Sequence, residues 1–284
     1  MPFGGINFGH VLAFQTKCMM KNQYSTLVEA LKTNNRKLVI AACLRLGWND
    51  AFRHVSENND NATIINNCVS YSPNSPHFKM MSAKQDSITD EEKNRLIFKI
   101  CECLVDYFDE FAKLVNTKER HKYINDKLNE PIFKNLIGII KKTTESKALC
   151  MGHIQKMFNI AMKVLVCLII SYEQAKALPY NVILNEDDCV YLTTNALLDS
   201  KEFNYSFDTA DCPVDSYILK AVDDKIVKRS QGINGHDKYA DIVWSKFGTK
   251  EDSNNYISVQ NEISNIQFGA GKCNLCFDFE NWNS

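Results

Sequence analysis

Residues Met157–Tyr172 read MFNIAMKVLVCLIISY, an apolar run interrupted by Asn159 and Lys163. A helix that spans a bilayer needs about 20 predominantly apolar residues, so this run is too short and too polar to cross a membrane. We therefore expect a helix over 154–172 that lies in the core of a soluble protein and does not contact a membrane.

Helical patterns also dominate the rest of the chain. A helix over 90–115 begins after Thr89, a good N-cap residue, and carries its apolar residues on one face. No strand-like alternation is sustained, so the sequence predicts an all-α, irregular multi-helix globular fold. Further helical patterns cover 119–129, 131–143, 185–198, 214–229, 238–247 and 254–264.

Two glycines are expected to interrupt helices. Gly47 follows the helical pattern of 37–46 and is expected to be its C-cap. Gly152 is a candidate break in a helical segment over 146–176. We predict one domain over 1–284, because neither an internal repeat nor a clean linker is evident. It would have a loop-rich excursion near 56–86 and a Gly-rich, then aromatic, tail over 268–284.

The 11 cysteines are scattered, and their number is odd, which is not typical of a secreted disulfide scaffold. Together with an N-terminus that does not resemble a signal peptide, they predict a reducing, cytoplasmic location. Cys273 and Cys276 have half of a zinc-site spacing, but a second such pair is absent from the sequence. Phosphate-binding glycine motifs are absent as well. We therefore expect no metal, no nucleotide and no other cofactor.

The net charge of −1 does not indicate a nucleic-acid partner, but charge is uneven along the chain. Residues 113–163 contain 11 Lys or Arg and 4 Asp or Glu. One interpretation is a solvated basic face. The other is a surface that binds phosphates by counterion release. A DNA-binding surface would include Lys141, Lys142, Lys147, His153 and Lys163.

The motif most suggestive of chemistry is Cys212-Pro213-Val214-Asp215-Ser216-Tyr217-Ile218-Leu219-Lys220. Asp215 stands where the N-cap of the following helix is expected, and backbone N–H groups would fix its carboxylate there. Upstream, Lys156 follows Gly152 at the head of the buried helix.

These two segments resemble the helix–hairpin–helix DNA glycosylase superfamily over about residues 150–225. The Val214-Asp215-Ser216 step matches that family's catalytic aspartate motif, and Lys156 corresponds to the lysine nucleophile of its bifunctional members. The family's Leu-Pro-Gly-x-Gly hairpin is absent from the sequence, and 173–211 would be an insertion. The resemblance implies an N-glycosylase that excises a flipped, damaged or modified base from DNA.

Structural alternatives stay open for both residues. Asp215 could be only a helix cap, and Lys156 only a solvated charge on an amphipathic helix. The protein would then be a non-catalytic helical module that binds nucleic acid or protein, with a role in microbial or phage defence as one context.

Overall fold

The computed structural model describes residues 5–18, 27, 30–31, 35–51, 103–130, 151–177, 198–199, 203–229, 239, 241–244, 247, 255–267 and 271–281. Helix is the only regular secondary structure in these ranges, which confirms the all-α prediction. Residues 103–113 are also helical. The named elements are α1 (Phe8–Cys18), α3 (Arg36–Ala51), α6 (Thr117–Leu128), α8 (Met151–Ala177), the 3₁₀ turn η4 (Phe207–Thr209), α9 (Ser216–Arg229), α10 (Asn255–Gln267) and α11 (Asn274–Asn281).

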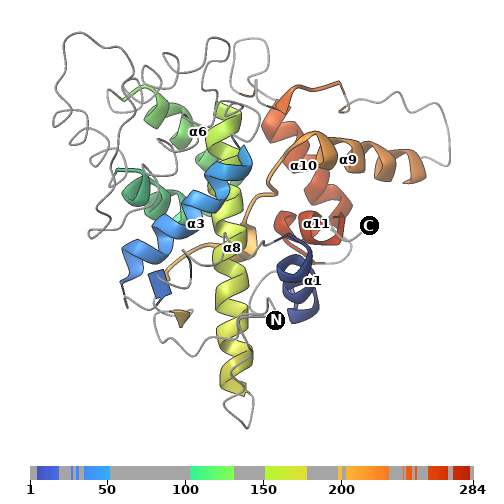
Figure 1. Ribbon diagram of the computed structural model, residues 1–284. Helices are drawn as coiled ribbons and strands as arrows, with labels where there is room; N and C mark the ends of the chain where they lie inside the picture. Colours follow the sequence, from blue (N-terminus) through green and yellow to red (C-terminus); the bar gives the residue numbers. More distant parts are fainter. Residues whose placement is uncertain are drawn as a thin grey trace.

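Helix α8 is the central element, and the other helices lie along its two sides (Figure 1). By length and composition it is the one described helix that could cross a membrane, but 94% of its apolar window is buried inside the protein. Such burial fits the core helix of a soluble protein and agrees with the prediction for 154–172. The α3 and α6 helices lie on one side of α8, and α9, α10 and α11 on the other.

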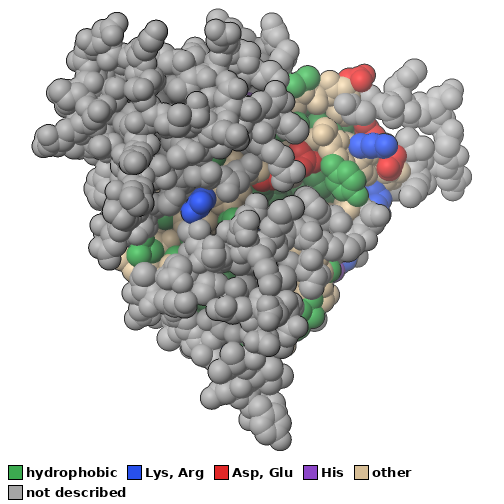
Figure 2. Space-filling view, in the orientation of Figure 1, with side chains coloured by type: hydrophobic (Ala, Val, Ile, Leu, Met, Phe, Trp, Pro, Cys, Tyr) green, Lys and Arg blue, Asp and Glu red, His purple; other side chains and the backbone are tan. Residues whose placement is uncertain are grey.

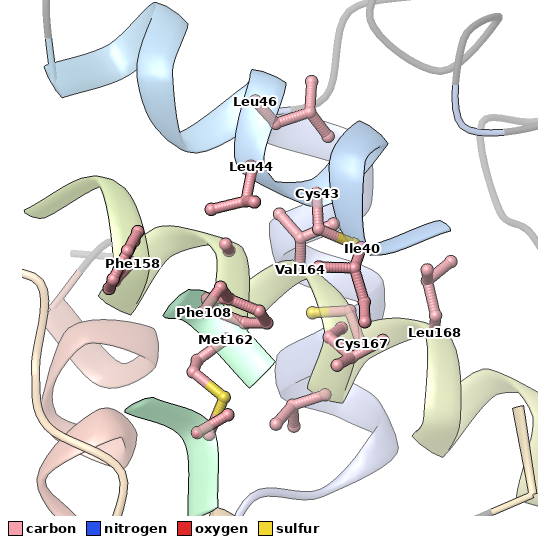
Figure 3. Close-up of a cluster of buried hydrophobic side chains, with 14 of the residues drawn as sticks. Ile40, Cys43, Leu44, Leu46, Phe108, Phe158, Met162, Val164, Cys167 and Leu168 are labelled. Carbon is pink, nitrogen blue, oxygen red and sulfur yellow. The ribbon is translucent and has the colours of Figure 1, made fainter. Parts of the chain in front are cut away.

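The hydrophobic core is built mainly between α3 and α8, which are in more extensive contact than any other two of the named helices. Residues 38–44 of α3 are all buried, so this helix is apolar around its whole circumference. Figure 3 shows Cys43 and Leu44 of α3 facing Val164 and Cys167 of α8. Buried cysteines pack here as small apolar side chains.

The expectation that Gly47 ends its helix is wrong, because α3 continues to Ala51. A Cβ atom at Gly47 would lie 2.2 Å from the backbone oxygen of Met157 in α8. Glycine is therefore required by the close approach of two helices and not by a left-handed cap. The extra turn of α3 that follows Gly47 carries Asp50 toward α8.

The described part of the C-terminal tail, residues 271–281, contributes to the core. Its α11 buries Phe277 and Phe279. Phe279 lies in the main cluster with the α3 and α8 side chains, and Phe277 lies in a second cluster with residues of α9 and α10. The tail thus connects the two apolar clusters of the described chain.

The predicted helix over 238–247 is wrong for the residues that the structure describes, because Tyr239, residues 241–244 and Phe247 are not α-helical. Asp223 of α9 explains this course, since its carboxylate accepts hydrogen bonds from the Tyr239 backbone N–H at 3.1 and 2.9 Å. An amide satisfied by a side chain need not enter a helical ladder. The expected features at 56–86 and 131–143, and almost all of 185–198, lie outside the described residues.

Candidate functional site: a lysine between two aspartates

Lys156 lies on the second turn of α8 with only 7% of its surface exposed. Its Nζ is 2.9 Å from Oδ2 of Asp50 and 3.4 Å from Oδ2 of Asp215. One base and two acids from α3, α8 and the start of α9 therefore meet at one point. The structure brings together Lys156 and Asp215, the two residues singled out from the sequence, and it adds Asp50.

Asp215 is held as the helix cap that the sequence predicted. Its Oδ1 accepts a hydrogen bond from the backbone N–H of Ile218 at 3.0 Å, while its other oxygen faces Lys156. The cap leaves 22% of the Asp215 side chain exposed. The carboxylate is thus fixed by the backbone on one side and can interact with a charge on the other.

The segment that leads to Asp215 is buried and held by side chains of three helices. Gln260 of α10 accepts from the Cys212 amide at 3.0 Å and donates to the Cys212 carbonyl at 2.7 Å. Arg120 of α6 pairs with Asp211 at 3.3 Å. Asn159 of α8 donates to the Cys212 carbonyl at 3.4 Å. These contacts fix the backbone just before Asp215, so the position of its carboxylate is determined by the whole fold.

Trp244 forms a wall of the site. Lys156 Nζ lies 4.8 Å from the centre of the indole ring, and the His153 ring packs edge-on against the same indole at 5.3 Å. Gly152 makes this approach possible, because a Cβ there would lie 2.1 Å from the Trp244 carbonyl oxygen. The expected break at Gly152 does not occur, since α8 runs through it. Glycine at position 152 allows α8 to pack closely against the backbone of Trp244.

Two of the residues expected to bind phosphate are buried. His153 is 5% exposed and packs on Trp244, and Lys163 is 2% exposed in an ion pair with the buried Asp278. The Lys163 ammonium also lies over the rings of Phe14 and Phe279, at 4.0 and 4.8 Å. Neither side chain can reach a phosphate in this conformation. Lys141, Lys142 and Lys147 lie outside the described residues.

The uneven charge of the chain is partly compensated inside the protein. Three buried bases of 113–163 pair with acids from the last third of the sequence: Arg120 with Asp211, Lys156 with Asp215, and Lys163 with Asp278. On the face shown in Figure 2, the visible described surface over α9 and α10 carries acidic beside hydrophobic side chains, and only scattered Lys and Arg. Part of the excess of basic residues in 113–163 is therefore used in ion pairs inside the protein and is not available for a surface that binds phosphates.

Burial dominates the electrostatics of Asp278 and Asp211. It raises the pKa of Asp278, an effect that Lys163 opposes and that the negative charges of Asp215 and Asp50 increase. Burial likewise raises the pKa of Asp211 against the opposing effects of Arg120 and two hydroxyl hydrogen bonds. The pKa of Asp278, a core residue, therefore depends in part on the charges of Asp215 and Asp50.

Asp50 is the site residue that sequence reasoning missed. It belongs to no recognisable motif, and only the continuation of α3 past Gly47 brings it to Lys156. The described residues contain no group of three or more His, Cys, Asp or Glu able to hold a metal ion.

No protein-family model, no curated protein and no solved structure significantly matches this chain. The fold and the site therefore define it in physical terms only, as an all-helical protein with a buried lysine between two carboxylates.

Proposed function

We propose that the protein is a DNA N-glycosylase-like base-excision enzyme and that Asp215 and Lys156 act on the sugar of a flipped nucleotide. The observation that carries this proposal is the distance of 3.4 Å between Lys156 Nζ and Asp215 Oδ2. The two residues are 59 positions apart in the sequence, and each belongs to one of the two segments that resemble the glycosylase motifs.

Asp215 would stabilise the sugar during cleavage. Breaking an N-glycosidic bond develops positive, oxocarbenium-like charge at C1′, which a fixed carboxylate stabilises without reorganising. Asp215 meets this need because its backbone contact fixes it and part of its side chain is exposed.

Lys156 would attack C1′ and form a Schiff base, which requires the neutral amine. In the structure, Lys156 is paired with two carboxylates, so its proton must leave before attack. Asp50, at 2.9 Å, is the nearer acceptor. A bound nucleotide would replace Asp215 as the partner of the Lys156 amine. The half-buried indole of Trp244 would offer an aromatic face beside the flipped base.

A second function is favoured by the internal pairing of Arg120, Lys156 and Lys163. If all three pairs are structural, the protein is a non-catalytic helical module that binds nucleic acid or protein. Its remaining contact surface would include the exposed Lys118 and Lys122 of α6 and the lysines near 141–147.

The reducing, cytoplasmic location also stays part of this proposal. It is supported by core cysteines of the described chain that form no disulfide, among them Cys43 and Cys212. DNA is the proposed partner.

Borohydride trapping tests the covalent step. Wild-type protein is incubated with duplex and single-stranded oligonucleotides that carry uracil, oxidised, alkylated or methylated bases, or an abasic site, and is then reduced. A covalent protein–DNA product is expected with wild type and not with Lys156→Ala. Lys225→Ala, a substitution of an exposed lysine on α9, is the matched control and should trap normally. Trapping that survives in Lys156→Ala would move the nucleophile elsewhere.

A further inference from the structure

A pair of thiols lies at the start of α11, away from the Lys156 site. Cys273 immediately precedes this helix and Cys276 lies in its first turn, with the two Sγ atoms 3.9 Å apart. The backbone N–H of Cys276 donates to the Cys273 carbonyl at 3.1 Å, so the turn that joins them is closed. A disulfide requires an S–S distance of about 2.05 Å and Cα atoms about 4.4–6.8 Å apart. Residues three apart in a helical turn meet the second requirement, and side-chain rotation can meet the first.

The two thiols are not equivalent. Cys276 has no exposed surface, and hydrogen bonding to Cys273 together with burial raises its pKa. Cys273 keeps 6% of its surface exposed. The hydrogen bond between the two sulfurs lowers the pKa of Cys273, an effect that backbone N–H groups at the start of α11 increase and burial opposes. One thiol is thus suited to react first, and the other is placed behind it.

A second pair of nearby cysteines provides an internal contrast. Cys43 of α3 and Cys167 of α8 face each other in the core (Figure 3), where both are essentially unexposed. Burial raises the pKa of Cys43, and the proximity of Cys167 raises it further. This pair should be chemically inert, because the thiolate is the reactive form.

We propose that Cys273 and Cys276 form a reversible thiol–disulfide site that reacts with small disulfides of the glutathione type. The Cys273 thiolate attacks one sulfur of the oxidant, forms a mixed disulfide and releases one thiol. The Cys276 sulfur then loses its proton, attacks Cys273 Sγ and displaces the second thiol. Two protein thiols are oxidised to one disulfide, and the oxidant disulfide is reduced to two thiols. This site does not depend on the proposed base-excision function.

The test uses the full chain equilibrated without oxygen in mixtures of reduced and oxidised glutathione. Free thiols are then alkylated and the protein is digested with trypsin. Cleavage after Lys272 leaves both cysteines on one peptide, 273–284, and cleavage after Lys37 and Arg45 isolates Cys43 on peptide 38–45. The expected product is peptide 273–284 lacking two hydrogens, formed reversibly with the glutathione ratio. Peptide 38–45 should stay in the thiol form.

Two variants determine the order of the steps. Cys276→Ser should accumulate a glutathione adduct on Cys273, whereas Cys273→Ser should carry none on Cys276. In wild type, alkylation of Cys273 should be roughly 10-fold or more faster than alkylation of Cys43, following thiolate content and access. A folded protein whose peptide 273–284 stays reduced in excess oxidised glutathione would overturn the proposal. So would stable glutathione adducts on wild-type Cys273 without closure to the internal disulfide.

Discussion

Gly47 of α3 and Met157 of α8 are in backbone contact, so close that a Cβ atom at position 47 would lie 2.2 Å from the Met157 carbonyl oxygen. This contact sets the distance between the two helices of the core. It also determines where the last turn of α3 meets α8, and that turn carries Asp50 to within 2.9 Å of Lys156 Nζ. Core packing and site geometry therefore depend on the same glycine.

Gly47→Ala should destabilise the protein although alanine is the better helix former. The added methyl group meets backbone atoms, which cannot rotate away, so the helices must separate at a cost of about 1–3 kcal/mol. Chemical denaturation measures this cost. Gly9→Ala is the matched control, because Gly9 is exposed on α1 and its nearest neighbour is the side chain of Asn7. Equal stability of the two variants would contradict the close approach of α3 and α8.

The buried pair Lys163–Asp278 should be structural. Asp278→Asn would leave an uncompensated charge in the core and lower the free energy of unfolding by about 3–5 kcal/mol. Replacing both members, Lys163→Met with Asp278→Leu, should restore much of that loss, because no charge is then buried. Thermal and denaturant unfolding of wild type and of the two variants measure these differences. A stable Asp278→Asn protein with weakened DNA affinity would instead support the phosphate-binding role first expected for Lys163.

Acid should remove the stabilisation that Asp109 provides. Burial alone would raise the pKa of Asp109, but hydrogen bonds from Lys113 and Tyr205 and the charge of Arg36 outweigh it and hold the pKa below its usual value. A carboxyl group with a depressed pKa stabilises the fold above its unfolded pKa of about 3.9, and the contribution is lost as the pH falls through the folded pKa. Asp109→Asn should thus be less stable than wild type at neutral pH, and the difference should shrink below about pH 4. Denaturant unfolding across this range measures it, and a difference independent of pH would contradict the assignment.

Features of the fold and the site that arise from interactions between residues close in the sequence can be predicted from it. Features that arise from contacts between distant residues cannot. The apolar periodicity of 154–172 predicts α8, and the position of Asp215 after Pro213-Val214 predicts its cap, because both signals are local. Asp50 could not be predicted, since its role arises from a contact between helices about 100 residues apart. Nor could the burial of Lys163 be predicted, because its partner Asp278 lies in a short tail whose aromatic residues gave no clear helical period.

Salt dependence should report any DNA-binding role of the basic segment. If Lys141 and Lys142 contact phosphates, Lys141→Glu with Lys142→Glu should weaken binding to all sequences similarly. The slope of log K against log salt should then become shallower by about 2. Fluorescence anisotropy at several salt concentrations measures this slope, with Lys225→Glu on α9 as the control. Undetectable DNA binding at low ionic strength would contradict every nucleic-acid function proposed for this chain.

We propose that Asp215 is a catalytic carboxylate as well as a helix cap, and Asp215→Asn separates the two roles. Asparagine caps a helix nearly as well as aspartate but lacks the charge that an oxocarbenium-like transition state requires. The most direct measurement is the single-turnover rate of base release by wild type, by Asp215→Asn and by Asp224→Asn, an exposed control on the same helix. We expect Asp215→Asn to stay folded and bind DNA but to release base about 10² times more slowly or worse, while Asp224→Asn matches wild type. Full base release by Asp215→Asn, or none by wild type across the set of modified bases, would contradict it.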